Sequence, residues 1–516
     1  MKQLLAYLTI PLCLTSFATA KETWSVDTLE QWTNQQAENE GVELKLGFAS
    51  PKGKTATYKS KLKKLATKQK LRSMVIEQSA IWQNWKKVPN VGPKNAQDAP
   101  VMLSIGDDDY WMFARYGGGQ VDQKVVRRLK IEEKVYMGKM TKNEGDAAIA
   151  KINAAPDTPG LGGNFVNKDP NQTNGSGGKK LGLGGYHAWH STDMEKWTHH
   201  GPVSNYKSRW MTTAEYVDGK FYLYYDNPND QDPHLIVDSD LKDGKMGKDH
   251  GLVFADPSDG SDNAVIRGLD GKFHFIYEDW TPLNASKQAW DSPLAGHAIS
   301  DDGIKDWKIL APAIDHRTKP TGKILTYRHG FQNPSILKYK EHLPKQNAYG
   351  DWAAITIGER YYLFADYDPS TNKKGRKGMS CAWFTSDSLD KKFTFCDNIG
   401  QGHPDPDITF AEGQFYLITQ FNQDFVSPGP WVNGVQARAG VDTDNDGKVD
   451  QWSEWQTVKE SYAHKPGFAK QVKKTPAQLD TSNLPAGHGF QFELKLTDTT
   501  ENDAKPILDK VTLTFE

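Results

Sequence analysis

Three aspartates stand at matching distances ahead of segments with the alternating aromatic pattern of a β-strand. Asp98, Asp262 and Asp351 lie 12, 11 and 10 residues before the first aromatic residue of such a segment. Two carboxylates at a suitable separation can act as acid and base on a glycosidic bond, and a third can tune the acid. A single aspartate before a strand most often caps a turn, so the register shared by all three favours a catalytic site. Glu215 is a further candidate for the acid.

A second set of residues fits a different chemistry, β-elimination from a uronic acid. That reaction needs an arginine to neutralise the carboxylate and a histidine or tyrosine as base. Arg267 or Arg328 could supply the first group, and His187 or His190 the second. His187 falls at the same repeat position as His297, which favours a structural role for that pair.

Aromatic side chains at strand ends and in long loops suit a sugar ligand. Flat rings stack on the apolar faces of pyranoses, while the sugar hydroxyls need polar partners. The candidate substrate-binding residues are Trp189, Arg209, Trp210, Trp280, Trp352, His403 and Asp405. Most other tryptophans are expected to pack between sheets.

The most specific short motif is DTDNDGKVD, residues 442–450. Acidic residues at positions 1, 3 and 5, glycine at 6 and aspartate at 9 are typical of a calcium loop. The expected ligands are Asp442, Asp444, Asp446, the Lys448 carbonyl and Asp450. We expect a structural Ca²⁺ here rather than a metal-free turn.

A repeat carries these residues. A turn followed by an aromatic strand recurs five times, as GDDDYWMFA, DGKFYLYY, DGKFHFIY, GERYYLFA and EGQFYLIT, each followed by a second strand pattern such as HAWHSTD or ARAGVDTD. Two patterns per unit predict the blades of a five-bladed β-propeller. The innermost strands of such blades start at the axis, so the residues ahead of them converge there. A large β-sandwich is the competing architecture, but it is not expected to repeat the same pair of patterns.

The predicted fold is all-β: a five-bladed propeller with a helical N-terminal segment and a short C-terminal β extension. The expected parts are a signal peptide over 1–20, the helical segment and linker over 21–97, the propeller over 98–455, and a β segment over 456–516 that closes or flanks the last blade. The helical expectation rests on the three-to-four spacing of residues such as Leu62, Leu65 and Leu71 among lysines.

Composition narrows the possible partners. The 516 residues carry 63 Lys+Arg against 65 Asp+Glu, a net charge of −2, which argues against nucleic acid as the main partner. Lys2, the apolar run over 4–17 and the small residues at 18–20 are typical of a cleaved signal peptide, and no later run is long enough to cross a membrane. We therefore expect a secreted or periplasmic protein. Cys381 and Cys396 could form a disulfide or remain core thiols.

Over roughly residues 98–423 the chain resembles the five-bladed propeller glycosidases of glycoside hydrolase families 43 and 117. The resemblance implies that Asp98 is the general base, Asp262 the modulator of the acid, and Asp351 the general acid. It places His403 where the fifth blade helps to hold a central ion or water. Two departures stand out: Ala99 follows the base where the family has proline, and Trp352 follows an acid that is usually glutamate before Gly-Pro.

The sequence thus predicts a carbohydrate-active enzyme, a glycosidase acting on plant or algal poly- or oligosaccharide. One alternative is a polysaccharide lyase or dehydratase acting on uronate-containing glycans, with a weaker resemblance to propeller-fold lyases such as ulvan lyases. Another is a non-catalytic glycan-binding propeller. The sequence leaves open which glycan is bound and how many copies of the chain associate.

Overall fold

The structure is a computed structural model. It describes residues 22–79, 86–93, 96–116, 120–136, 138–156, 159–161, 172–174, 185–204, 210–227, 232–256, 260–279, 294–315, 318, 346–400, 402, 405–419, 424–429, 434–498 and 505–516. The predicted signal peptide lies outside these residues. Strands dominate, in agreement with the expected all-β class.

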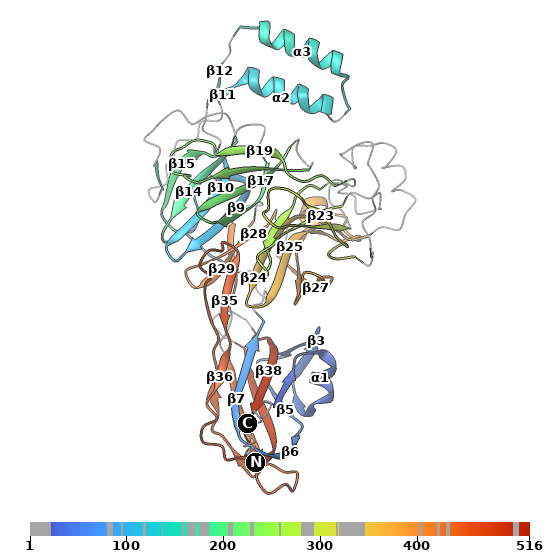
Figure 1. Ribbon diagram of the computed structural model, residues 1–516, viewed down its shortest axis with the longest axis vertical. Coiled ribbons are helices and arrows are strands. Elements are labelled where there is room, and N and C mark those ends of the chain that lie inside the picture. Colours follow the sequence, from blue (N-terminus) through green and yellow to red (C-terminus); the bar gives the residue numbers. More distant parts are fainter. Residues whose placement is uncertain are drawn as a thin grey trace, which may run out of the picture.

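Five sheets lie in the upper part of the molecule (Figure 1), and contacts between their first strands close them into a ring. Ring sheet 1 is β9 (Ala96–Gly106), β10 (Asp109–Tyr116), β14 (Tyr186–Ser191), β15 (Trp197–Pro202) and β13 (Gln172–Asn174); ring sheet 2 is β16 (Trp210–Val217), β17 (Lys220–Asp226), β18 (Pro233–Asp238) and β19 (Lys248–Leu252); ring sheet 3 is β20 (Ala264–Arg267), β21 (Phe273–Glu278), β22 (Ala295–Ser300) and β23 (Lys308–Ile309); ring sheet 4 is β24 (Ala348–Ile357), β25 (Arg360–Asp368), β26 (Ser380–Ser386) and β27 (Thr394–Ile399); ring sheet 5 is β28 (Asp407–Ala411), β29 (Gln414–Thr419), β30 (Asp424–Gly429) and β8 (Lys86–Lys87). The first strands β9, β16, β20, β24 and β28 contact one another in that order, and β28 contacts β9. Because β8 comes from before ring sheet 1 in the chain, its pairing with β30 ties the two ends of the ring together.

Local sequence explains the hairpins of the ring. The turn between β16 and β17 holds Asp218 and Gly219 at φ 48° and 80°, and the turn between β28 and β29 holds Glu412 and Gly413 at 49° and 72°. Two consecutive positive φ values are the requirement of a type I′ turn, whose twist matches that of paired strands. The aromatic strands that follow are buried on both faces, as in β21, where all six residues are buried.

Strands from both ends of the chain form a second body, called here the sandwich, in the lower part of Figure 1. One sheet contains β3 (Val42–Lys45), β4 (Phe48–Pro51), β38 (Leu508–Phe515), β7 (Leu71–Gln78), β36 (Ala477–Leu479) and β1 (Glu22–Val26); the other contains β2 (Gln36–Glu40), β5 (Thr55–Ser60), β37 (Gly487–Thr497), β31 (Val435–Asp442), β32 (Gln451–Trp452), β33 (Gln456–Thr457) and β6 (Lys63–Gln69). Their facing sides share one core, in which Trp24 and Phe492 lie 5.4 Å apart and Phe490 and Phe515 lie 5.1 Å apart. Burial of each such phenylalanine contributes about 1.5–3 kcal/mol.

The sandwich corrects three predictions. The segment over 21–97 is not helical: its one helix in the described residues is α1 (Leu29–Asn34), capped by Thr28, and the rest is strand. The segment over 456–516 does not simply flank the last blade, since β37 and β38 pair with N-terminal strands. The ARAGVDTD pattern also leaves the ring, because β31 pairs with β37 along eight residues. Strands far apart in sequence form backbone hydrogen bonds with one another here, and local periodicity does not reveal such pairings.

One hairpin joins the sandwich to the ring. Strands β34 (Ser461–His464) and β35 (Gln471–Thr475) pair antiparallel, and β35 also pairs parallel with β24 of ring sheet 4. We call residues 461–475 the axial hairpin, because its tip contacts the first strand of every ring sheet, as described below. Figure 1 shows β35 continuing from the ring towards β36 in the sandwich.

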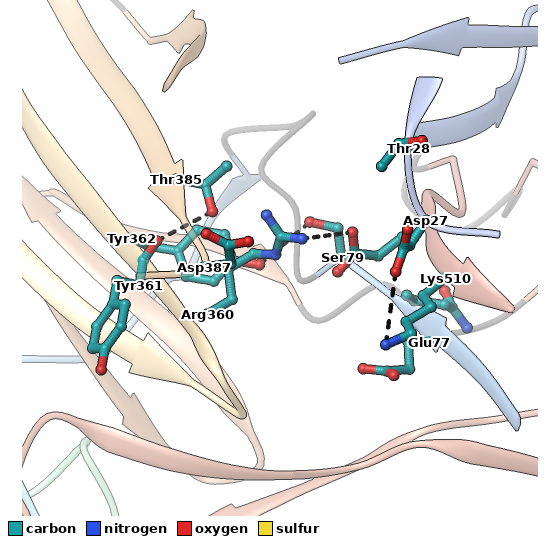
Figure 2. A network of polar contacts seen from close by, with 12 residues as sticks. Asp27, Thr28, Glu77, Ser79, Arg360, Tyr361, Tyr362, Thr385, Asp387 and Lys510 are labelled. Carbon is teal, nitrogen blue, oxygen red and sulfur yellow. Dashed lines mark hydrogen bonds and ion pairs between the residues drawn. The ribbon is translucent and has the colours of Figure 1, made fainter. Parts of the chain in front are cut away.

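A polar interface also connects ring sheet 4 to the sandwich (Figure 2). Arg360, at the start of β25, forms an ion pair with Asp509 of β38 at 2.9 Å. The hydroxyl oxygens of Tyr362 and Ser79 lie 3.3 Å apart. These contacts, together with the axial hairpin, fix the sandwich against the ring.

A helical hairpin extends from ring sheet 1 at the top of Figure 1. It contains α2 (Gln123–Tyr136) and α3 (Lys142–Ala154) on a two-stranded stem of β11 (Gln120–Asp122) and β12 (Pro159–Leu161). A short 3₁₀ helix, η2 (Gly375–Gly378), lies between β25 and β26 of ring sheet 4. Among the helices that the structure describes, none has the length and apolar character needed to cross a membrane.

Cys381 and Cys396 are both buried free thiols. They lie on the paired strands β26 and β27, but the register places Cys381 opposite Ile399. A disulfide between them therefore does not form in this structure. Burial raises the pKa of Cys396 to about 12, which keeps that thiol protonated and unreactive.

Candidate active site

The start of each ring sheet carries a backbone irregularity at an equivalent place. Bulges interrupt β9 at residues 98–100, β16 at Thr212, and β24 at Asp351 and Trp352. Asp262 and Asp405, each two residues before the first strand of its sheet, have φ values of 48° and 38°, and Asp351 has 50°. Bulges and left-handed residues turn side chains out of the regular alternation of a strand and are common next to active sites.

These strand starts meet at the axis of the ring. The Trp352 backbone N–H donates to the Asp262 carbonyl at 3.2 Å, which joins ring sheets 3 and 4. The Asp405 N–H donates to Asp366 Oδ1 at 2.8 Å, which joins ring sheets 4 and 5. Carboxylate oxygens of Asp351, Asp366 and Asp405 all lie within 4.8 Å of one another. We call these three residues the axial cluster.

The axial cluster brings three carboxyl groups together at a site largely removed from solvent. Asp366 and Asp405 are buried and Asp351 is half-buried. Carboxylates this close repel one another when all are ionised, and a shared proton or a bound cation is what relieves such repulsion. A group that can keep a proton beside an opening is what a general acid requires.

The structure places the three predicted catalytic aspartates at this end of the ring. Asp262 and Asp351 are half-buried at the starts of ring sheets 3 and 4. Asp98 lies in the bulge of β9, but its side chain is outside the described residues. The predicted register therefore holds for the backbone at all three positions.

Two acids of the site were missed by sequence reasoning. Asp366 in β25 and Asp226 at the end of β17 are both buried, and each accepts a hydrogen bond from a strand-start N–H of the next ring sheet, that of Asp405 or Asp262. A signal was present, since both acids follow an aromatic strand directly, in YYLFAD and FYLYYD. These carboxylates hold the strand starts that carry Asp262, a predicted catalytic residue, and Asp405, a predicted substrate-binding residue.

Glu215 and Arg267 serve the opposite end of the ring, which corrects their predicted roles. Glu215 Oε1 accepts from the Ala469 N–H at 3.0 Å, and Arg267 donates to the Gly467 carbonyl at 3.2 Å. The Arg267 guanidinium also lies 4.4 Å from the centre of the Phe468 ring. Both side chains are thus engaged with the axial hairpin, and Glu215 is fully buried, which removes it as a substitute acid and Arg267 as a binder of uronate.

The predicted histidine bases are also elsewhere. His187 is buried with its Nδ1 3.0 Å from His199 Nε2, and burial holds the pKa of His187 well below its ordinary value. His190 contacts Asp109, with 3.0 Å between Nε2 and Oδ1. This contact lies beside the turn at the end of β9, whereas the axial cluster lies at the strand starts. Neither residue reaches the axial cluster through a described contact.

The tryptophans divide between core and rim. Trp189 and Trp352 are almost fully buried, Trp189 stacked on His199 at 4.7 Å and Trp352 packed 5.6 Å from Phe384, so neither is free to stack on a sugar. Trp210 is half-buried, and the Arg115 guanidinium lies 3.5 Å from the centre of its ring. The predicted binding residues Arg209, Trp280 and His403 lie outside the described residues, as does Arg328, the other arginine considered for β-elimination.

The predicted calcium loop gathers its carboxylates at the end of β31. Oxygens of Asp442, Asp444 and Asp450 lie within 4.8 Å of one another, while Asp446 Oδ1 accepts from the Lys448 N–H at 2.8 Å. The Gly447 N–H donates to Asp442 Oδ2 at 2.9 Å. This oxygen-only donor set fits a hard cation such as Ca²⁺. The loop belongs to the sandwich rather than to the last blade, where it was expected.

A pocket opens on ring sheet 4 beside the start of β24, lined by residues of β24, β26 and β27. It has a volume of about 420 Å³. Tyr349, Phe384 and Phe395 supply aromatic walls, and Asn347 and Ser370 supply polar groups. This combination suits a sugar ring.

Neither a protein-family model nor a curated protein sequence matches this chain. Solved structures do match. A thermostable family-43 glycoside hydrolase shares 11% identity at a TM-score of 0.36, over 78% of this chain and 98% of that one. The enzyme of glycoside hydrolase family 43 from Xanthomonas citri, complexed with xylose, shares 13% at 0.35, over 71% and 93%.

The α-L-arabinanase of Cellvibrio cellulosa, complexed with arabinohexaose, shares 11% identity at a TM-score of 0.34, over 74% of this chain and 96% of that one. These structures are those of glycosidases, the group that the sequence was expected to resemble.

Proposed function

We propose that the ring is a five-bladed β-propeller and that this chain is a glycoside hydrolase. The observation that carries the proposal is the axial cluster, in which aspartates from two ring sheets share one site beside the backbone of Asp262 from a third. A glycosidic bond is cleaved by two carboxyl groups, one protonated and one ionised. The aromatic pocket beside β24 supports a sugar ligand.

In the proposed mechanism Asp98 takes a proton from water as the water oxygen attacks the anomeric carbon. Asp351 gives its proton to the departing glycosidic oxygen, and the products are two sugars, one with inverted configuration at the new hemiacetal. Asp262, whose N–H is held by Asp226, tunes the acid. Secretion or export to the periplasm belongs to the same proposal, because a polymeric glycan is met outside the cell.

The contacts of Arg267 with the axial hairpin and of His187 with His199 engage these two predicted residues elsewhere, which weakens the β-elimination alternative. If the wild type cleaves no glycan, the result favours the other alternative, a glycan-binding propeller without catalytic activity.

The test is an assay of the full chain on a panel of polysaccharides, beginning with arabinan, xylan and uronate-rich algal glycans. Reducing ends measure hydrolysis, and ultraviolet absorbance of unsaturated uronate measures elimination. The variants are Asp98→Asn and Asp351→Asn. Asparagine tolerates positive φ as aspartate does, so Asp351→Asn should keep the bulge while removing the acid.

We expect each variant to lose turnover by about 10²-fold or more, with an unchanged melting temperature. Asp306→Asn is the matched control, since Asp306 also has positive φ, at 55°, and its side chain is 83% exposed on ring sheet 3. Full activity in both axial variants, or absorbance instead of reducing ends, would overturn the proposal.

A further inference from the structure

The tip of the axial hairpin occupies the centre of the ring at the end opposite the strand starts. It bonds to the first strand of all five ring sheets through one residue or more of each strand. The partners are Ser104 of β9, Glu215 of β16, Arg267 of β20, Thr356 of β24 and Asp407 of β28. A segment that meets every sheet at once lies on the axis.

Lys470 is the residue of this hairpin that extends towards the axial cluster. Its ammonium forms an ion pair with Asp407, and the side chains are 4% and 8% exposed. Asp407 Oδ2 accepts from the backbone N–H of Met102 in β9. One carboxylate thus links the hairpin cation to ring sheets 5 and 1.

Asp407 stands two residues after Asp405, a member of the axial cluster. The short segment between them is held at one end by Asp366, which accepts from the Asp405 N–H, and at the other by Lys470. Loss of the ammonium would leave the Asp407 carboxylate buried without its cation, which a protein relieves by protonation or by local rearrangement. Either response acts on the strand start that carries Asp405.

We propose that Lys470 is a positioning residue of the axial site. Its ammonium, brought into the ring by the axial hairpin, holds the Asp407 carboxylate in place and so fixes Asp405 against Asp351 and Asp366. The inference rests on the proposed function for its kinetic readout. It assigns to a residue of the C-terminal chain a part in a site otherwise built from the ring.

Other charged groups near the Lys470–Asp407 pair also contribute to the pH dependence of activity. Glu215 of β16 interacts with both Lys470 and Arg267 of β20. His464 and Lys465 lie on the same hairpin, where His464 contacts the Ser104 carbonyl and Lys465 donates to Gln471. The described polar contacts from β9 and β24 come from backbone groups of Ser104, Met102 and Thr356. Removal of the ammonium favours the protonated state of every nearby carboxyl group.

The test compares Lys470→Met and Lys470→Arg with Lys474→Met in the full chain. Lys474 is the matched control, because it lies on the same hairpin, its side chain is 9% exposed, and it pairs with Glu460 and Glu77 near the sandwich instead of the axis. The measurements are kcat, KM and the pH profile on whichever glycan the wild type hydrolyses, the melting temperature, and a crystal structure of Lys470→Met.

We expect Lys470→Met to lower kcat at least 10-fold with little change in KM, and to move the acid limb of the pH profile to higher pH. Lys470→Arg should recover part of kcat. Lys474→Met should lower the melting temperature while leaving kcat, KM and the pH profile as in the wild type. In the crystal, Asp405 of Lys470→Met should have moved away from Asp351.

Two failures are distinguishable. A wild type that hydrolyses no glycan contradicts the proposed function, and the crystal structure still decides the inference. A Lys470→Met protein with wild-type kcat and pH profile, or with Asp405 unmoved where the wild type is inactive, overturns the role of Lys470.

Discussion

Two pairs of buried histidines occupy the interior of ring sheets 1 and 3. His187 and His199 are 3.0 Å apart between ring nitrogens, and His274 and His297 are 2.8 Å apart. Burial lowers the pKa of His297 to about 3, with a further contribution from His274, whose own pKa is lowered by burial to about 4. A buried pair of this kind shares one hydrogen bond as neutral imidazoles, so it stabilises the sheet only while it stays uncharged.

These histidines predict a loss of stability in mild acid. An unfolded histidine takes up its proton near pH 6.5, whereas His274 and His297 resist protonation down to about pH 4 and 3. Stability is therefore full above about pH 6.5 and falls with decreasing pH, by about 1.4 kcal/mol per pH unit for each histidine. Urea unfolding of His297→Gln between pH 7.5 and 5 should give a shallower slope than wild type. His488→Gln in the sandwich is the control, and equal slopes in wild type and His297→Gln would contradict the prediction.

At the residue scale, spacing located some of the site and missed the rest. Asp262 and Asp351 could be found because the repeat fixes their register ahead of an aromatic strand. Trp189 and Trp352 were misjudged because the exposure of a ring depends on the neighbouring strand or sheet, which the spacing does not contain. Asp366 went unnoticed although the repeat marks it, since a strand-end acid has no evident partner until two sheets are adjacent.

The predicted calcium loop at residues 442–450 is the element whose prediction depends most directly on local sequence. Asp442, Asp444 and Asp450 converge without help from distant residues, because the turn residues at 445 and 447 both have positive φ.

Ca²⁺ binding to the folded loop should stabilise the protein by about 2.7 kcal/mol at a free Ca²⁺ concentration one hundred times the Kd. We expect a chelator to lower the melting temperature and added Ca²⁺ to restore it in the wild type. Asp442→Asn should abolish this response, whereas Asp480→Asn, in an exposed turn, should retain it. A wild-type melting temperature unchanged by chelation would exclude a stabilising ion.

At the element scale, the N-terminal segment shows where periodicity misleads. Leu65 and Leu71 have helix-like spacing with their neighbours, yet they lie on separate strands, β6 and β7. Within β7 the buried residues Met74, Ile76 and Gln78 alternate with less buried ones, which is the period of a strand. A run that crosses a turn mixes two registers, and the mixture resembles a helix. The short helix at Leu29–Asn34 was part of the same prediction and is present.

At the scale of the whole molecule, the interface in Figure 2 predicts a measurable coupling between ring and sandwich. Arg360→Met would leave Asp509, whose side chain is 11% exposed, without its ion pair. We expect a loss of about 1–3 kcal/mol in the free energy of unfolding. Lys391→Met is the control, since its pair with Asp387 in the same ring sheet is 66% and 60% exposed and should contribute less than about 1 kcal/mol. Equal effects of the two variants in thermal unfolding would contradict the assignment of this interface.

The axial hairpin makes a stronger prediction about the whole chain. A chain of residues 86–433 would lose Lys470 and Ala469, which removes the hairpin's ammonium from the buried carboxylate of Asp407 and its N–H from that of Glu215. Loss of one partner of a buried ion pair alone costs about 3–5 kcal/mol, a large part of the stability of a typical protein. We expect this chain to show no cooperative unfolding transition by circular dichroism. A stable ring with a sharp transition would show that the sandwich is dispensable.

The sequence by itself determined the repeat, the register of Asp98, Asp262 and Asp351, the acidic loop at 442–450 and the predominance of strands. Each of these depends on residues close together in the chain, where spacing and turn chemistry act directly. Only the tertiary structure decided that both chain ends build a sandwich, that its hairpin enters the ring, and that Glu215 and Arg267 bind that hairpin. Those outcomes depend on burial and hydrogen bonding between segments far apart in the chain, such as Asp407 with Lys470 across 63 positions and Glu215 with Ala469 across 254. Local sequence patterns do not reveal such contacts. A buried charge is stabilised by a partner that the fold brings close to it, and that partner is not among its neighbours in sequence.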